Sequence, residues 1–183
     1  MTNFEIDDCL RSLQIIVDTR EQPSKRAQNR YEAFQCPYIR QKLNYGDYAY
    51  NFKLPSGKWL YDENKPVSAD VVIERKADLN ELSQCFCQSR KRFEEEFKRA
   101  AEKGATVYLL VEDASWENIL NGKYSTKFNA KAYTSSMLAW IARYNIKPIF
   151  CKSETSGKLI KEILYRELKE RLERGEYDHG LEL

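Results

Sequence analysis

The 183-residue sequence has only one histidine and no CxxC pair among its cysteines, and each of these absences excludes a kind of site. The single histidine, His179, lies in the C-terminal tail, where we expect no catalytic role. The five cysteines are an odd number without a CxxC pair, so neither a disulfide framework nor a zinc site is predicted. Cys85 and Cys87 are two positions apart, which places their sulfurs on different sides of a helix. We therefore expect reduced thiols.

Long hydrophobic runs are also absent. The longest apolar stretches, such as residues 107–111, have the length of a strand and are far too short to span a membrane. Residues 1–13 contain several acids and lack the apolar centre of a secretory signal. We therefore expect no membrane partner and a cytoplasmic protein, or a nuclear one if the host is eukaryotic.

The charges of the chain nearly cancel. The chain has 30 lysines and arginines and 28 aspartates and glutamates, so the formal net charge is +2. A global positive field that would attract nucleic acid is lacking, and any such surface must come from local patches. The sequence contains no repeat, low-complexity tract or linker, and its length favours a single domain over residues 1–183.

The order of the expected elements predicts an α/β fold. Strands are expected at 13–18, 38–43, 47–54, 58–62, 71–76, 105–111 and 146–151, with a hairpin turn at 55–57. Helices are expected at 24–34, 78–104, 115–121, 130–144 and 156–174, followed by a loose tail over 175–183. This order predicts a mixed central sheet flanked by helices, with a core over about residues 13–151.

Apolar spacing predicts which helix faces are buried. Residues 78–104 have apolar side chains every three or four positions, including Phe86, Phe93 and Phe97, which we assign to the core of one long helix. Asp78 and Glu81 match a capping box at its start, and Gly104 ends it. The inward residues expected in the last two helices are Met137, Leu138, Ile141 and Tyr144, and then Ile160, Ile163, Leu164, Leu168 and Leu172.

Two short motifs place acids and a lysine at strand ends. Gly46-Asp47-Tyr48 opens one expected strand, and Glu74-Arg75-Lys76 ends the continuous apolar strand at 71–76. Because successive side chains on a strand point to opposite faces, Glu74 and Lys76 share a face and Arg75 points away. Gly46 suits a positive φ or a close backbone approach. Asp18, at the end of the first strand, adds a third carboxylate.

These residue types suit metal-dependent phosphodiester chemistry. A divalent cation shared by Asp47 and Glu74 would keep both buried carboxylates ionised, and hard carboxylate oxygens favour Mg²⁺ or Mn²⁺. Lys76 would orient a metal-bound water or stabilise the transition state. The alternative is that Asp47, Glu74 and Lys76 form surface ion pairs, and the three residues alone leave it open.

Three motifs in this order resemble the nuclease domain of the XPF-type endonucleases, a branch of the restriction-endonuclease-like PD-(D/E)xK superfamily. They are the segment VDTRE at 17–21, Gly46-Asp47-Tyr48, and the segment VIERK at 72–76, which match the strings VDxRE and GDX(n)ERKX(3)D. The resemblance implies a restriction-endonuclease-like fold and divalent-metal-dependent cleavage of branched, flapped or forked DNA in repair, recombination or replication. Two alternatives stay open: a catalytically silent DNA-binding or scaffold member that partners another nuclease, or a structural domain with an accidental match.

The resemblance also implies roles for individual residues. Asp47 and Glu74 would be metal ligands, together with Asp18, and Lys76 would be the catalytic lysine. The supporting residues would be Asp18, Arg20, Glu21 and Arg75.

The chain departs from the family pattern at two places. The last acid of the motif falls on Asn80, which can support the site by coordination or hydrogen bonding but adds no charge. The DNA-gripping helix-hairpin-helix domain of many members is missing, which suggests a stand-alone form.

DNA contacts are expected from Arg90, Lys91 and Arg92, from Lys25, Arg26 and Arg30, and from the 123–127 loop with Lys123 and Lys127. A solvated face is the alternative for each, with Arg92–Glu96 and Lys91–Glu95 as i,i+4 pairs. Members of this family often dimerise, so the helices at 130–144 and 156–174 are candidate homodimer interfaces, although their apolar stripes would equally suit a core.

Overall fold

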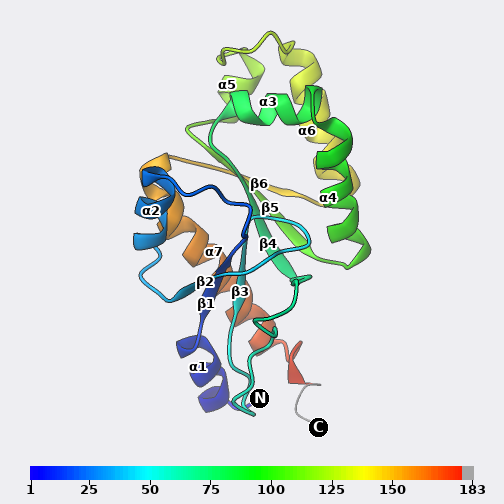
Figure 1. The fold of residues 1–183 in the computed structure, drawn as a ribbon. Helices are drawn as coiled ribbons and strands as arrows, with labels where there is room; N and C mark the ends of the chain where they lie inside the picture. Colours follow the sequence, from blue (N-terminus) through cyan, green and yellow to red (C-terminus); the bar gives the residue numbers. More distant parts are fainter. Residues whose placement is uncertain (179–183) are drawn as a thin grey trace.

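The computed structural model describes residues 1–178 and is built around a six-stranded mixed sheet (Figure 1). Its strands are β1 (Gln14–Val17), β2 (Tyr38–Arg40), β3 (Tyr48–Asn51), β4 (Val71–Lys76), β5 (Thr106–Glu112) and β6 (Lys147–Cys151). They lie in the order β2-β1-β3-β4-β5-β6. β3 is antiparallel to both β1 and β4, whereas the other neighbours are parallel. The expected mixed sheet flanked by helices is confirmed.

Helices cover both faces of the sheet. One layer contains α3 (Leu79–Cys87), α4 (Arg90–Glu102), α5 (Trp116–Leu120) and α6 (Ala130–Tyr144). The other contains α1 (Asn3–Arg11), α2 (Lys25–Glu32) and α7 (Ser156–Glu173), which follows the short 3₁₀ turn η1 (Ser153–Thr155). Each layer forms its own apolar core, so Val71, Val72 and Ile73 of β4 are buried on both sides, as predicted. Within residues 1–178 no helix is long and apolar enough to cross a membrane.

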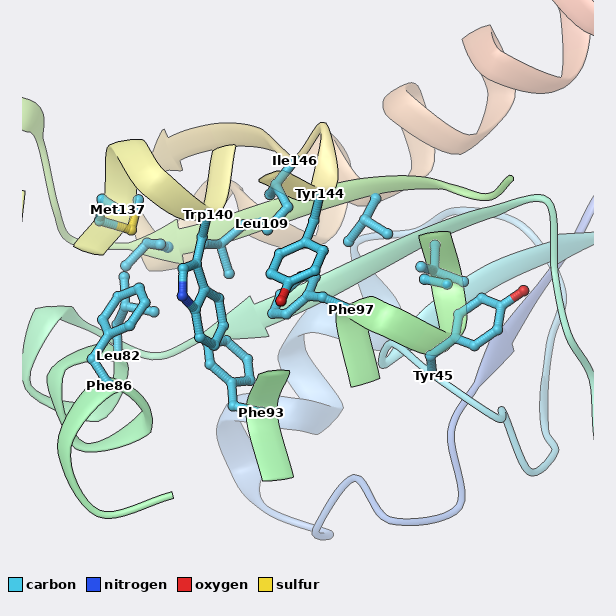
Figure 2. Packing of buried hydrophobic residues seen from close by; sticks show 14 of the residues in the cluster. Tyr45, Leu82, Phe86, Phe93, Phe97, Leu109, Met137, Trp140, Tyr144 and Ile146 are labelled. Carbon is cyan, nitrogen blue, oxygen red and sulfur yellow. The ribbon is translucent and has the colours of Figure 1, made fainter. Parts of the chain in front are cut away.

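Trp140 of α6 is the centre of an aromatic cluster beside the sheet (Figure 2). Its ring centroid lies 4.9 Å from that of Phe86, 5.1 Å from Phe93 and 5.4 Å from Phe97. These contacts confirm the three phenylalanines as core residues. They also join α3, α4 and α6 into one packed layer.

The inward face of α6 differs from the expected one at two of its four residues, because Leu138 is exposed and Ile141 is only half-buried. Met137 and Tyr144 are buried as predicted, but Leu138 is 53% exposed. The buried series runs Tyr133, Met137, Trp140 and Tyr144, which is the spacing of one helix face. Leu138 lies about 100° around the axis from Met137 and therefore faces outward.

The single long helix expected over residues 78–104 is wrong, because the structure has two helices there. Asp78 caps the first as predicted and accepts the Glu81 N–H at 2.8 Å, and Gly104, with φ +67°, follows the end of the second. Between them Ser89 leaves helical geometry, with φ −111° and ψ 19°. The apolar period does not reveal this break, because both helices direct their apolar residues at the same tryptophan.

Residues 58–62 do not form the expected strand. The turn before them is present, with Gly57 at φ +80° and its N–H donating to the Leu54 carbonyl at 2.8 Å. Beyond the turn, the Asn51 side chain accepts the Tyr61 N–H at 3.0 Å and donates to the Tyr61 carbonyl at 3.1 Å. A side chain thus replaces the backbone partner that a ladder would need.

Both ends of the described chain are more ordered than the sequence indicates. No element was assigned to residues 1–13 from the sequence, and Thr2 and Glu5 form a capping box that starts α1. In the segment expected to be a loose tail, Tyr177 is buried, and its hydroxyl lies 2.6 Å from that of Tyr50. Residues 179–183, including His179, lie outside the described part.

Candidate active site

A cleft of about 500 Å³ lies where β4 ends, between the segment after β1 and the helices α3 and α4. The residues predicted for the site that line it are Arg20, Glu21, Asp47, Glu74, Arg75 and Lys76. They come from three segments separated by more than 20 residues in the sequence. The structure therefore brings together the proposed catalytic residues, with the exception of Asp18.

Gly46 positions Asp47 by both of the routes that the sequence suggests. Its φ is +75°, and a Cβ atom at this residue would lie 2.7 Å from the Val72 Cβ. The Asp47 N–H then donates to the Ile73 carbonyl at 2.8 Å, and the Asp47 carbonyl accepts the Asp18 N–H at 2.8 Å. Asp47 is thereby fixed between the ends of β1 and β4.

Glu74 and Lys76 share a face of β4, as the strand geometry predicts. Both are buried, and the Lys76 Nζ lies 2.6 Å from the Glu74 Oε1. The same ammonium lies 4.9 Å from the ring centroid of Phe93, which places it over an aromatic face. We call Asp47, Glu74 and Lys76 the carboxylate cluster.

The carboxylate cluster carries more negative than positive charge. Burial raises the pKa of Asp47 well above its usual value, and the nearby Glu74 carboxylate raises it further. Burial also raises the pKa of Glu74, although Lys76 acts against this shift. Burial alone would lower the pKa of Lys76, but Glu74 and Asp47 raise it. The Asp47 and Glu74 carboxylates thus repel each other, and a cation beside them would relieve this repulsion.

The donors of the carboxylate cluster fit Mg²⁺ or Mn²⁺. Within residues 1–178 no three His, Cys, Asp or Glu side chains are grouped to hold a metal ion. Asp47 and Glu74 offer a pair of carboxylates, and Mg²⁺ is commonly held by one or two carboxylates together with waters and substrate phosphates. In the described residues each carboxylate uses one oxygen in a hydrogen bond, Asp47 with the Arg75 N–H and Glu74 with Lys76.

Asp18 does not join this pair, contrary to the expected third metal ligand. It is fully buried and does not line the cleft. Its Oδ1 accepts the N–H and the Nε–H of Arg20, both at 2.7 Å, and its Oδ2 accepts the Leu43 N–H at 2.6 Å. Asp18 therefore holds Arg20, whose other end reaches Glu96 of α4 at 2.9 Å.

Arg75 points away from the carboxylate cluster, as predicted, into a second group of charges. Its Nη1 donates to Glu112 at 3.3 Å, and its Nη2 lies 3.7 Å from Glu21. Glu112 was not predicted as a site residue, although the apolar run of β5 ends in this acid in the same way that the run of the first strand ends in Asp18.

Arg30 was predicted to contact DNA, and the structure places it in the lining of the cleft. Its side chain is only 3% exposed, and it donates to Glu112 at 3.2 Å and to the Tyr48 hydroxyl at 3.0 Å. Arg26 lies nearer the surface and pairs with Glu112 at 2.8 Å and with Asp113 at 3.3 Å. Lys25 is exposed.

The basic first turn of α4 borders the cleft. Arg90, Lys91 and Arg92 are exposed, and Arg92 lines the cleft. The i,i+4 pairs expected for Lys91 and Arg92 are wrong, because Glu95 pairs with Lys98 and Glu96 with Arg20. Among residues 1–178 the three basic side chains have no ion-pair partner within 4.0 Å.

Asn80 connects α3 to the 123–127 loop. Its Oδ1 accepts the Ser125 N–H at 2.7 Å, and its Nδ2 donates to Asp78 at 3.3 Å. It does not line the cleft, nor do the exposed Lys123 and Lys127. Asn80 therefore acts on loop position in this structure.

Comparisons with known proteins give the family and the fold of the chain. The family model of the ERCC4 domain matches residues 17–163. The structure of XPF from Aeropyrum pernix has a similar fold, with a TM-score of 0.57 and 20% identity over 84% of this chain and 61% of that one. The structure of the same protein in complex with DNA gives a TM-score of 0.57 and 21% identity over 84% and 64% of the two chains. The chain thus spans less than two thirds of these structures. A comparison with curated proteins gave no match.

Proposed function

Because the chain belongs to the ERCC4 domain family, we propose that it is a metal-dependent DNA endonuclease, with Mg²⁺ or Mn²⁺ as its cofactor. The observation that carries this proposal is the carboxylate cluster, in which Glu74 binds Lys76 and Asp47 lines the same open cleft. An ion pair on the surface, the alternative considered from the sequence, would not require burial of Glu74 and Lys76.

Each residue of the carboxylate cluster has a distinct part in the proposed hydrolysis of a phosphodiester bond. Asp47 and Glu74 would hold the divalent ion, which when bound lowers the pKa of a water and neutralises phosphate charge. Lys76 is protonated and bonded to Glu74 at 2.6 Å, so its Nζ donates hydrogen bonds and does not act as a base. It orients the attacking water or stabilises charge that develops on the phosphate. Asp18 contributes by holding Arg20.

The proposed substrate is branched, flapped or forked DNA, in repair, recombination or replication. Support comes from the resemblance of the motifs and from the similar fold of XPF from Aeropyrum pernix, a structure of which is a complex with DNA. The exposed first turn of α4 adds basic side chains at the border of the cleft. These are suited to the phosphates of a DNA arm.

A homodimer is part of the same proposal, but the structure changes where its interface is expected. The apolar stripe of α7 is core: Ile160, Leu164, Leu168 and Leu172 are buried against the sheet. On α6 the exposed apolar residue is Leu138. The α7 stripe is therefore withdrawn as a candidate interface.

A cleavage panel tests the proposal. Purified protein is incubated with single-stranded, duplex, flap, fork and four-way DNA in Mg²⁺, in Mn²⁺ and in EDTA. We expect metal-dependent cutting of at least one branched substrate and none in EDTA. DNA binding without cleavage of any substrate would favour a silent scaffold member of the family instead.

A further inference from the structure

Glu112 is the shared partner of three arginines at the back of the cleft. It is fully buried at the end of β5 and lies 2.8 Å from Arg26, 3.2 Å from Arg30 and 3.3 Å from Arg75. Glu21 completes the group, 3.7 Å from Arg75 and 3.8 Å from Arg30. We call these five residues the arginine cluster.

Only part of the arginine cluster reaches the cleft. Arg26, Arg30, Arg75 and Glu21 line it, whereas Glu112 does not. Glu112 therefore cannot touch a bound substrate in this arrangement. Any effect of Glu112 on the site must pass through the guanidinium groups that it holds.

The guanidinium of Arg75 is held on two sides. Its Nη1 donates to Glu112, and its Nη2 faces Glu21, while its backbone N–H donates to the Asp47 carboxylate at 2.8 Å. Its Nε–H is buried and has no hydrogen-bond partner within residues 1–178. One residue thus contacts both charged clusters, through its backbone on one side and its side chain on the other.

We propose that Glu112 is a positioning residue, which aims the Arg75 guanidinium at a phosphate of the DNA backbone in the cleft. This inference rests on the proposed function. A planar guanidinium binds phosphate through paired N–H groups, so its orientation decides how well it binds. Glu112 fixes that orientation from inside the protein.

For the DNA affinity of Glu112→Gln, the proposal predicts a change opposite in direction to the one expected from net charge alone. Glu112→Gln removes one negative charge near the cleft, so a uniform field would bind DNA more tightly. If Glu112 positions Arg75, the same variant binds DNA more weakly, because Arg75 loses a fixed phosphate contact. The slope of the logarithm of the binding constant against the logarithm of the salt concentration should then decrease by about the contribution of one phosphate contact.

The test is a double-mutant cycle with Arg75→Met. We expect Glu112→Gln to lower the cleavage rate of a flap by about tenfold to a hundredfold in the wild-type background. In the Arg75→Met background the same substitution should lower it by less than about twofold, because the residue through which it acts is gone. Equal losses in both backgrounds, or tighter DNA binding by Glu112→Gln, would overturn the proposal.

Controls separate this inference from the proposed function. If the wild type cuts no DNA, the dissociation constants of the DNA complexes in EDTA are measured for the same four proteins of the double-mutant cycle. The proposal then requires that Glu112→Gln weakens DNA binding in the wild-type background and has little effect in the Arg75→Met background. Glu167→Gln is the matched control, since Glu167 also pairs with a lysine and an arginine but lies outside the cleft. If Glu112→Gln gives no cooperative melting transition, Glu112→Asp replaces it, because it keeps the charge and withdraws the carboxylate by one methylene.

Discussion

The two charged clusters on either side of β4 differ in the sign of their excess charge. The carboxylate cluster has two acids and one lysine, whereas the arginine cluster has three arginines and two acids. Side chains on a strand alternate between its two faces. Glu74 and Lys76 therefore belong to the carboxylate cluster, and Arg75, which lies between them in the sequence, belongs to the arginine cluster. One short motif thus builds a surface suited to a cation and, beside it, a surface suited to phosphate.

The largest expected effect comes from neutralising the carboxylate cluster. Asp47→Asn or Glu74→Gln should lower the cleavage rate by about a thousandfold or more, because a metal ligand is lost. Mn²⁺ binding, followed by calorimetry, should weaken in the same variants. Glu167→Gln should keep the wild-type rate, and a comparable loss in that control would show that the assay reports general damage.

The same change from acid to amide should have opposite effects on the stability of the two clusters. In EDTA, Asp47→Asn should raise the free energy of unfolding, because burial and Glu74 disfavour the charged form of Asp47. Glu112→Gln should lower it by about 2–3 kcal/mol, because buried guanidinium groups lose their acceptor. Urea titrations measure both values. A shift of the same sign in both variants would contradict the comparison.

A smaller effect is expected from the exposed arginine beside the carboxylate cluster. Arg92→Ala should weaken DNA binding by about threefold to tenfold and lower the salt dependence by about one phosphate contact. Fluorescence anisotropy at several salt concentrations measures both. Lys123→Ala, a charge change on a loop that does not line the cleft, is the comparison, and an equal loss there would assign the effect to net charge.

The smallest effect is expected at the position where the chain departs from the family motif. Asn80→Asp should change the cleavage rate by less than about threefold, because Asn80 contacts Ser125 and Asp78 and does not line the cleft. The new carboxylate would also face Asp78. A large gain in cleavage rate or metal affinity in Asn80→Asp would show that this position takes part in the site.

The site was predictable where local rules decide it. Alternation on a strand correctly placed Glu74 and Lys76 together and Arg75 apart, and the conformational freedom of Gly46 was apparent from its residue type. Glu112 was missed because it enters through pairing of β5 with β4, and no sequence spacing reports which strands are neighbours. The contacts of Asp18 with Leu43 and of Arg30 with Glu112 could not be predicted for the same reason, since these partners are distant in the chain.

The fold was predictable where hydrophobic periods are long. The bounds of α6 were predicted correctly, while the break at Ser89 was hidden because both flanking helices face Trp140. Leu138 was assigned to the buried face although it lies one residue beyond the buried Met137. The spacing of apolar residues alone does not distinguish between two adjacent apolar positions at the edge of a helix face. The strand expected at 58–62 is reduced to an isolated bridge between Lys53 and Trp59, because the Asn51 side chain takes the backbone hydrogen bonds of Tyr61.

The hydrogen bonds of Asp47 have a consequence for the order of folding. They reach the backbone of Asp18, Ile73 and Arg75, so this carboxylate acquires its position only when β1 and β4 have both assembled around it. Closing such distant contacts is a late and cooperative event. A ligand of Asp47 therefore binds the native state and not a fragment of it. At a hundred times its dissociation constant, such a ligand would stabilise the whole fold by about 2.7 kcal/mol.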